Sequence, residues 1–366
     1  MTAASAPSRL SWTLVVPLLG LVTLVLTWGR DLGPVIVAIA ALVLAGTVLA
    51  AVHHAEVIAL RVGEPYGSLV LAVAVTVIEV ALIVTLMISG GPETATLARD
   101  TVFAAVMITT NGIIGLSLLL GALKYGVTLF NSEGSGAALA TVATLTTLSL
   151  VFPTFTTSQQ GPEFTAPQLA FAALASLALY VMFVLTQTVR HRDFFLPLTP
   201  EGEVVETDEH APRPSGREAG TSLVLLLVAL VAVVGLAKVE SPAIEAAVAA
   251  AGFPHSFVGV VIALLVLLPE TIAAGRAALR GRIQTSLNLG FGSAMASIGL
   301  TIPVIAIASV WLDGPLLLGL GSTQMVLFAI TVVVSALTVV PGRATRLQGG
   351  VHLVLLAAFL FLATNP

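Results

Sequence analysis

Two apolar stretches, Ala74-Val-Thr-Val-Ile-Glu79-Val-Ala-Leu-Ile83 and Leu264-Leu-Val-Leu-Leu-Pro-Glu270-Thr-Ile-Ala273, decide how this sequence is interpreted. Each places one glutamate in the middle of a hydrophobic run, and the other acidic residues are expected in the breaks between such runs or in one polar loop. A carboxylate inside a bilayer costs about 3 kcal/mol or more unless it is paired, hydrated, protonated or bound to a cation. Glu79 and Glu270 are therefore the first candidates for a functional site.

The composition is that of a polytopic membrane protein. Of the 366 residues, 57% are hydrophobic and 9% are charged, and the mean hydropathy of +1.05 excludes a soluble domain with an ordinary charged surface. The net charge of -4 comes largely from one acidic loop and argues against nucleic acid as a partner. Because the chain has no cysteine, disulfides and thiolate metal sites are excluded and oxygen ligands remain for any metal. No bound cofactor is expected.

Apolar runs of about 20 residues, the length of one transmembrane helix, divide the chain. Breaking the runs at charges and at Gly/Pro clusters predicts eleven spans and so an all-α integral membrane fold. The first run is followed by Gly29-Arg30-Asp31, where a signal peptide would carry small residues, so it is interpreted as an uncleaved span. The predicted spans run near residues 11–28, 33–52, 66–89, 101–122, 137–153, 167–189, 221–237, 256–275, 284–311, 315–340 and 349–364.

The placement of Lys and Arg predicts the orientation of the chain. With a cytoplasmic N-terminus, only Arg30, Arg99 and Lys238 of the 15 basic residues fall in outside segments. The other twelve fall inside, and such an excess follows the positive-inside rule. We therefore expect the N-terminus in the cytoplasm and the C-terminus outside. The inside residues are Arg9, Arg61, Lys124, Arg190, Arg192, Arg213, Arg217, Arg276, Arg280, Arg282, Arg343 and Arg346.

One long polar stretch, residues 190–220, divides the sequence into two halves. Without the first span, five spans precede this stretch and five follow it, and each half carries its glutamate in its second span. The next span of each half carries a similar pattern, Asn111-Gly-Ile-Ile-Gly115 and Asn288-Leu-Gly-Phe-Gly292, followed within two residues by a serine. Since an odd number of spans turns the second copy over, we predict two inverted five-helix repeats, the architecture of secondary transporters. The expected parts are an N-terminal transmembrane helix (1–31), the first repeat (32–189), an acidic cytoplasmic loop (190–220) and the second repeat (221–366).

The two glutamates indicate a chemistry. Two carboxylates brought together near the membrane midplane cannot both stay ionised cheaply, so they must hold protons or a cation. Ca²⁺ prefers about six to eight oxygen ligands, and Pro269 adds one because it frees a backbone carbonyl on the preceding turn. Competition between protons and a cation for the same oxygens makes an antiporter. The predicted cation and proton ligands are Glu79, Glu270, Asn111, Asn288, Thr76, Ser117 and Ser293, with Glu79 and Glu270 as the metal ligands.

The residues around both glutamates also resemble a known family. Besides the two glutamate stretches, the resemblance rests on Gly63-Glu-Pro-Tyr-Gly67, Gln284-Thr-Ser-Leu-Asn288 and Gly292-Ser-Ala-Met-Ala-Ser-Ile-Gly-Leu-Thr-Ile-Pro303. With these motifs nearly the whole chain is similar to the ChaA-type calcium/proton antiporters of the cation/calcium exchanger superfamily. The resemblance implies a sodium/calcium exchanger-like fold and a bacterial inner-membrane protein that exchanges Ca²⁺, and also Na⁺ or K⁺, for protons by alternating access. Many members carry Gly-Asn shortly before each glutamate, where this chain has Val75-Thr76 and Val266-Leu267.

Other classes of function fit the sequence less well. The nearest alternative is a Na⁺/Ca²⁺ exchanger or a monovalent cation/proton exchanger of the same fold. A glutamate ring in a channel normally comes from symmetric subunits and not from two unequal repeats in one chain. No span carries the Gly-x-Ser-x-Gly or His-Glu-x-x-His pattern of an enzyme. We therefore expect a secondary transporter and not an enzyme, with the lipid bilayer and the transported ions as its partners.

Several of these residues also have a purely structural interpretation. Asn111 and Asn288 could hydrogen-bond neighbouring helices, and the motif glycines and serines could serve close packing. His53-His54 and Glu56, near the end of the second span, are interpreted as interfacial anchors, with a pH gate as the alternative. The acidic loop is interpreted as a solvated linker.

Overall fold

The computed structural model describes residues 11–63, 66–90, 94–198, 214–311 and 314–366, and this part of the chain is almost entirely helical. Nine of the described helical segments are long and apolar enough to cross a membrane, and the shorter apolar helices Trp12–Thr27 and Val73–Ile88 account for the other two predicted spans. The prediction of an all-α membrane protein with about eleven spans is confirmed.

The elements in chain order are α1 (Trp12–Thr27), α2 (Pro34–Val62), α3 (Tyr66–Gly90), α4 (Leu97–Met107), η2 (Ile108–Ile113), α5 (Ile114–Tyr125), β1 (Thr128–Leu129), α6 (Ser132–Thr146), η3 (Thr147–Val151), α7 (Phe152–Phe155), α8 (Ala166–Leu185), η4 (Thr186–Arg190), η5 (Arg192–Phe195), α9 (Gly216–Ala250), α10 (Phe257–Leu279), α11 (Ile283–Ala308), α12 (Ser322–Val339), β2 (Arg343–Ala344) and α13 (Arg346–Thr364). The segments η2, η3 and η4 are π-helical, and η5 is a 3₁₀-helix.

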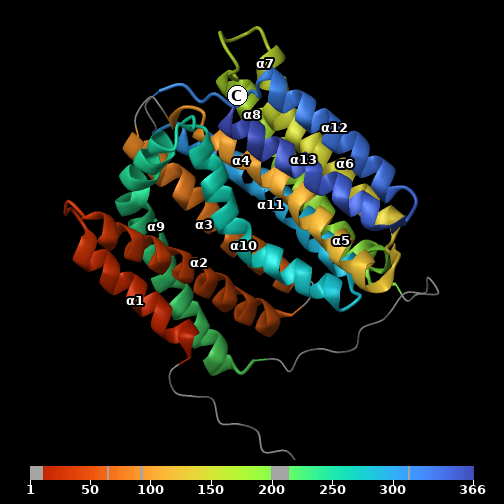
Figure 1. The fold of residues 1–366 in the computed structure, drawn as a ribbon, viewed down its shortest axis with the longest axis horizontal. Helices are drawn as coiled ribbons and strands as arrows, with labels where there is room; N and C mark the ends of the chain where they lie inside the picture. Colours follow the sequence, from red (N-terminus) through yellow and green to blue (C-terminus); the bar gives the residue numbers. More distant parts are fainter. Residues whose placement is uncertain (1–10, 64–65, 91–93, 199–213, 312–313) are drawn as a thin grey trace, which may run out of the picture. The chain divides into compact units, whose positions relative to one another are not determined.

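The chain forms two compact units. The first contains residues 1–85 and 211–244, and so α1, α2, most of α3 and most of α9. The second contains residues 86–210 and 245–366, and so the remaining helices. In the first unit α1 packs along α2 (Figure 1).

His54 joins three helices of the first unit. Its Nε2 donates to the Thr13 carbonyl oxygen at the start of α1 at 2.9 Å, and its Nδ1 lies 3.2 Å from Ser222 Oγ in α9. The ring is only 4% exposed, because α2 continues to Val62 instead of ending near residue 52. The interpretation of His54 as an interfacial anchor is therefore wrong: it is a buried contact between helices.

In the second unit, α8 lies along α11, and α13 lies along η2 and α5 (Figure 1). Small residues allow the helix axes to approach closely at both contacts. A methyl group added at Gly299 of α11 would lie 2.7 Å from Tyr180 Cβ of α8. A methyl group added at Gly349 of α13 would lie 2.6 Å from the Leu119 backbone nitrogen of α5. The last helix before the polar loop thus packs on a helix after it, and the last helix of the chain packs on one before it.

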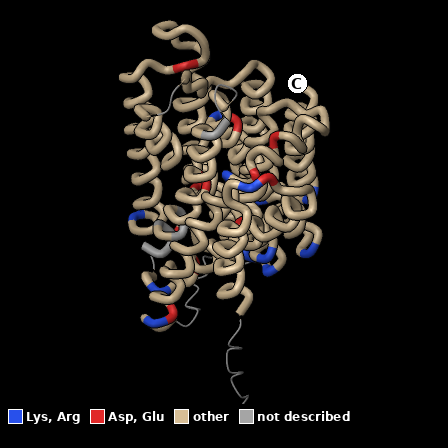
Figure 2. The backbone as a smooth tube through the Cα atoms, turned by 90° about the vertical axis from the view of Figure 1, so that its left-hand side faces the viewer, with Lys and Arg blue, Asp and Glu red and all other residues tan. Residues whose placement is uncertain are grey.

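One end of the second unit carries nearly all of its basic residues. Lys124 Nζ donates to the Leu279 carbonyl oxygen at 2.6 Å, and β1 pairs antiparallel with β2 beside it. The opposite end holds Arg99. Long helical stretches without charge separate the charged positions (Figure 2). The basic residues that gather at the first end are Lys124, Arg190, Arg192, Arg276, Arg280, Arg282, Arg343 and Arg346.

The structure corrects the expectation that only two acidic residues lie inside membrane helices. The helix α9 continues to Ala250 instead of ending near residue 237, and Glu240 within it is 1% exposed. A charge ends an apolar run in the sequence, but it does not end a helix, because the backbone hydrogen bonds continue. The positive charge of Lys238, in the same helix, lies beside an aromatic ring, because its Nζ is 5.4 Å from the centre of the Trp28 ring.

Two further expectations concern the loops. The helix α12 begins at Ser322 and not near residue 315, because Leu317 in the preceding segment pairs with Glu163 in an isolated β-bridge. The acidic part of the predicted cytoplasmic loop, from Glu201 to His210, lies outside the described residues. Its interpretation as a solvated linker stays a prediction.

Candidate cation-binding site

Glu79 lies on the buried face of α3, in the first unit. Its side chain is 4% exposed, and Thr76, one turn earlier, is also 4% exposed. The fully apolar neighbours Ile83 and Leu86 continue the same face. The pairing of Thr76 with Glu79 on one helix face, predicted from their spacing, therefore occurs.

Glu270 lies in α10 of the second unit, on the face that carries the buried residues Val266 and Ala274. Pro269 stands inside the same helix, where it provides no N–H for the Leu265 carbonyl oxygen. One turn after Glu270, the Ala274 carbonyl oxygen accepts a hydrogen bond from Ser286 Oγ of α11. This stretch of α10 thus offers a carboxylate and backbone oxygens inside an apolar span.

Contacts on either side of Glu270 place it level with η2. About three turns before it, Gly259 packs on the backbone of Asp100 and Thr101 in α4. One turn after it, Ala274 is joined through Ser286 to Ser117 of α5. About three turns after Thr101 in the α4 helix lies Gly112, and one turn before Ser117 of α5 lies Ile113. Both residues belong to η2.

The helix α11 closes the other side of this level. Ser286 of α11 contacts Ala274 of α10. Gly290 lies one turn after Ser286, and Glu270 lies one turn before Ala274. A methyl group at Gly290 would lie 3.0 Å from Ile114 Cγ1 and 3.5 Å from the Thr109 carbonyl oxygen. Glu270, η2 and Gly290 therefore mark one level of the second unit, where α10, α11 and the α4–α5 helix meet.

The amide of Asn111 is buried in η2 and has its own hydrogen-bond partners. Its Nδ2 donates to Thr331 Oγ1 of α12 at 3.0 Å, and its Oδ1 lies 3.0 Å from Nδ1 of His352 in α13. His352 was not singled out by the sequence, although a histidine inside an apolar run, as in Val351-His352-Leu353, was the available signal. The ring is 1% exposed, and its Nε2 lies 3.2 Å from Thr338 Oγ1.

The amide of Asn288 also contacts residues other than the glutamates. Its Nδ2 donates to the Phe195 carbonyl oxygen at 2.7 Å, and its Oδ1 accepts a hydrogen bond from Gln284 Nε2 at 2.9 Å. Gln284 in turn accepts a hydrogen bond from the Asn131 backbone N–H at 2.7 Å. Asn111 thus joins η2 to α12 and α13, and Asn288 joins α11 to η5, while any role of either as a cation ligand stays a prediction.

The two predicted serines differ in their surroundings. Ser117 is fully buried, and its Oγ lies 2.8 Å from Ser286 Oγ, one turn from the level of Glu270. Ser293 is half-buried on α11, beside Gly292, which has open space where a methyl group would be. By contrast, Gly115 packs on His352 and so serves close approach, as the alternative interpretation of the motif glycines expected.

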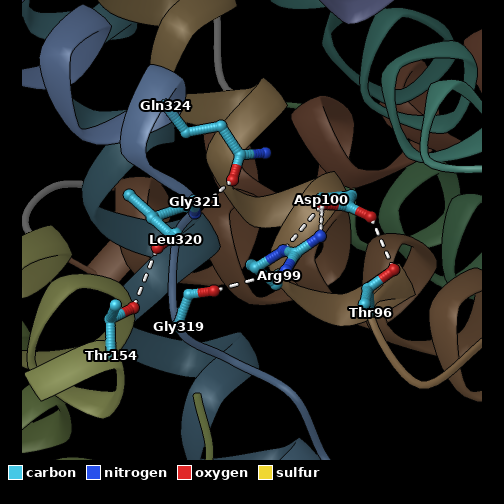
Figure 3. Close-up of polar contacts among 8 residues, drawn as sticks. All are labelled: Thr96, Arg99, Asp100, Thr154, Gly319, Leu320, Gly321 and Gln324. Carbon is cyan, nitrogen blue, oxygen red and sulfur yellow. Dashed lines mark hydrogen bonds and ion pairs between the residues drawn. The ribbon is translucent and has the colours of Figure 1, made fainter. Parts of the chain in front are cut away.

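A polar cluster ties together the end of the second unit opposite the basic residues (Figure 3). Arg99 Nη2 and Asp100 Oδ1 form an ion pair at 2.8 Å, and Thr96 Oγ1 donates to Asp100 Oδ2 at 2.8 Å. Arg99 Nη1 also donates to the Gly319 carbonyl oxygen, and Thr154 Oγ1 donates to that of Leu320. These contacts fix the start of α4 to the segment before α12. A cavity of about 280 Å³ lies beside the cluster and is lined partly by Asp100, Ser256 and Gln324.

Within the described residues, no group of three or more His, Asp or Glu side chains forms a metal site. Carboxylate, hydroxyl and backbone oxygens, such as those of Glu270, Ser117 and the α10 backbone, suit a hard cation such as Ca²⁺, Na⁺ or K⁺.

The chain is similar to known transport proteins over most of its length. "Putative ionic transporter y4hA" of Sinorhizobium fredii is 45% identical over 358 residues, which are 97% of this chain and 96% of that protein. "Sodium-potassium/proton antiporter ChaA" of Escherichia coli is 36% identical over 351 residues, 95% of this chain and 94% of that protein. A "Ca(2+)/H(+) antiporter" of Aphanothece halophytica is 23% identical over 328 residues, 85% and 86% of the two chains.

Solved structures show the same fold. The structure of native YfkE has a TM-score of 0.70 at 16% identity and covers 97% of this chain and 99% of its own. The H⁺/Ca²⁺ exchanger CAX has a TM-score of 0.68 at 15% identity, with 95% and 86% covered. The profile of the sodium/calcium exchanger protein family matches residues 32–189 and 221–365, which include both glutamates and both asparagine motifs. This chain is a multi-pass membrane protein and belongs to the sodium/calcium exchanger protein family.

Proposed function

We propose that the protein is a secondary antiporter that exchanges a cation for protons across the bacterial inner membrane. The observation that carries the proposal is the matched pair of glutamates, each on the buried side of an apolar span and each inside a range that the family profile matches. The family consists of secondary transporters, and the relatives from Escherichia coli and Aphanothece halophytica are both named as antiporters that move protons.

In this mechanism Glu79 and Glu270 bind either the cation or protons. A bound cation or two protons neutralise the carboxylates, so the loaded protein can change the side to which the site opens. With both carboxylates ionised and no cation bound, that change would carry two negative charges through the apolar interior. This difference in cost couples the flow of the cation to the flow of protons. Thr76, Asn111, Asn288, Ser117 and Ser293 are proposed as additional ligands, and no cofactor is required.

Ca²⁺ is the cation that we propose first, because two carboxylates match its charge and its preference for oxygen. Sodium or potassium is the second candidate. It is favoured by the name of the Escherichia coli relative and by the contacts of Asn111 and Asn288, which already engage both amide oxygens.

The orientation follows from the basic end of the second unit. Eight of its Lys and Arg residues gather there, whereas Arg99 lies at the opposite end. We propose that the basic end faces the cytoplasm, which places the N-terminus inside and the C-terminus outside.

Proteoliposomes that enclose a pH-sensitive dye test the function. Calcium, sodium, potassium and magnesium chloride are added outside in separate experiments, with the permeant anion thiocyanate at equal concentration on both sides in a parallel series to remove any membrane voltage. We expect calcium, or sodium and potassium, to drive protons across the membrane in both series. A cation current without proton movement would indicate a channel, and no response to any of the four salts would contradict the proposal.

A further inference from the structure

Glu240 is an acidic residue inside a membrane-spanning helix that the proposed mechanism does not use. It lies in α9, where Ala229, Val233 and Leu236 share its face of the helix at steps of three or four residues, and all three are fully buried. Glu240 itself is 1% exposed. The carboxyl group therefore points into the protein, away from both lipid and water.

Glu240 lacks the partners that an ionised carboxylate needs. Its Oε1 is buried without a hydrogen-bond partner, and no ion pair to Glu240 is found among the described residues. The nearest basic residue in the sequence, Lys238, is exposed and holds its Nζ over the Trp28 ring. Arg30 and Asp31, in the connection between α1 and α2, are exposed as well. Because a buried charge without compensation costs far more than a buried neutral acid, the carboxyl group carries a proton.

Contacts with α1 place Glu240 near one end of the first unit. Gly235 of α9 packs against Leu24 in the last turn of α1. One turn later along α9, Lys238 lies beside Trp28, the residue that follows α1. Glu240 is therefore level with the end of α1. In the proposed orientation, in which α1 begins in the cytoplasm, this end faces outside.

Glu79 lies deeper in the same unit. The helices α3 and α9 begin at one end, because Arg61, in the last turn of α2, donates to the Pro214 carbonyl oxygen just before α9. Glu79 lies about three and a half turns along α3, and Glu240 lies about six and a half turns along α9. The two carboxyl groups are therefore separated by roughly three turns, or about 16 Å, along the helix direction. One cation cannot bind both.

Pro242 weakens α9 beside Glu240. Because proline has no N–H, the Lys238 carbonyl oxygen lacks the donor that it would have in an uninterrupted helix. A helix bends most easily where such a hydrogen bond is missing. Pro242 is exposed, whereas Glu240 is buried. A bend at this point changes the surroundings of the carboxyl group without moving the earlier turns of α9.

We propose that Glu240 is a proton-binding site separate from the cation site: when α9 bends at Pro242, the carboxyl group exchanges its proton with water at the outer end of the first unit. The proton passes between a carboxyl oxygen and a water molecule, and no other bond forms or breaks. The inference rests on the proposed antiport and its orientation. It adds a carboxyl group on α9 to the path that protons follow during exchange.

Infrared spectroscopy of the purified protein tests whether the proton is present, because a protonated carboxyl group absorbs at a higher frequency than a carboxylate or an amide. We compare the wild type with Glu240→Gln, which keeps the shape of the neutral acid but has no acidic proton. Glu245→Gln, farther along the same helix, is the matched control. At neutral pH we expect a carboxylic acid band that is missing in Glu240→Gln and kept in Glu245→Gln. The full set of bands in Glu240→Gln would overturn the inference.

Exchange with water is tested on the same band and on transport. Transfer of the wild type into heavy water should shift the band, since only a carboxyl group that meets water exchanges its hydrogen. In proteoliposomes, Glu240→Gln should lower the maximal rate of cation-driven proton movement about tenfold or more, as expected when a proton-transfer group is lost. The apparent KM for the cation should stay within about threefold, because the cation ligands are unchanged. Glu245→Gln should keep both values. A native rate in Glu240→Gln would mean that the proton is a fixed part of the structure and would refute its role in exchange.

Two comparisons keep the outcome decisive. If Glu240→Gln does not fold, Glu240→Asp assigns the band, because the two acids absorb at different frequencies, and a band that does not shift in heavy water then refutes the inference. If the wild type moves no protons with any of the four cations, the antiport proposal fails and the role of Glu240 falls with it. If the wild type exchanges normally while Glu240→Gln keeps its band or its rate, the role of Glu240 alone is wrong.

Discussion

At the scale of single residues, the two glutamates carry the proposed exchange. Replacement of Glu79 or Glu270 by Gln keeps the shape of the side chain but removes one negative charge. We expect either variant to insert and purify normally, because a neutral amide can make hydrogen bonds and needs no charge compensation inside the protein, and to lose cation-driven proton movement at least tenfold. Glu133→Gln, on the exposed first turn of α6, is the control. Coupled exchange at the native rate by a Glu79 or Glu270 variant would defeat the mechanism.

The same residues set the expected dependence on pH. As the pH falls, protons occupy the carboxylates of Glu79 and Glu270 and displace the cation. The apparent KM for the cation should therefore rise toward low pH in the native protein, measured with equal pH on both sides of the membrane. A KM that does not change over several pH units would mean that protons and the cation do not share these groups.

The two glutamates were identifiable from the sequence, because a charge in an apolar run is visible without a structure. The partners of Asn111 were not, since Thr331 and His352 follow it by more than 200 positions and their contact depends on how α12 and α13 pack. The roles of Asn111, Asn288 and the other ligands remain predictions, because their contacts with a cation have not been tested.

At the scale of elements, helix ends are held by specific side chains. Asp100 is 3% exposed at its side chain and is paired with Arg99, which is 16% exposed. Removing one partner of such a pair leaves a buried charge, so we expect Arg99→Met to destabilise the protein by about 3 kcal/mol. Arg99→Met combined with Asp100→Asn should recover part of the loss. Thermal unfolding of the purified variants measures both effects, and equal midpoints for the single and double variants would contradict the pairing.

The contact between α5 and α13 offers a second comparison. Gly349→Ala should destabilise the protein by about 1 to 3 kcal/mol, because the added methyl group would meet the Leu119 backbone at 2.6 Å. Gly350→Ala is the matched control one position later, where nothing lies within 4 Å, and it should be neutral or slightly stabilising. Thermal unfolding midpoints compare them, and equal effects of the two substitutions would mean that the close approach of the helices carries no energy.

The sequence predicted which segments form helices, but it did not predict where the helices end or where the π-turn η2 lies. Apolar runs of membrane length predict helices because every backbone group must be paired inside the helix. They fail at α9, where Lys238 and Glu240 interrupt the run without interrupting the helix. No local sequence pattern distinguishes η2 from the flanking α-helix.

At the scale of the whole molecule, the orientation is testable because the native chain has no cysteine. We introduce single cysteines at Ser215, Ser158 and Asn365, all of which are exposed. A membrane-impermeant maleimide added to intact cells should label the cysteines at positions 158 and 365, and the one at 215 only after the membrane is opened. The reverse labelling pattern would contradict the proposed orientation.

The crossed packing of α8 on α11 and of α13 on η2 and α5 has a consequence for how the protein is made. Synthesis proceeds from the N-terminus, so Asn111 enters the membrane long before its partners Thr331 and His352 leave the ribosome. Until then the early helices hold buried polar groups that lack their final partners. A nascent chain that stops before α13 would therefore be recognisable to quality-control proteases, and assembly of the second unit can be completed only after α13 has been made.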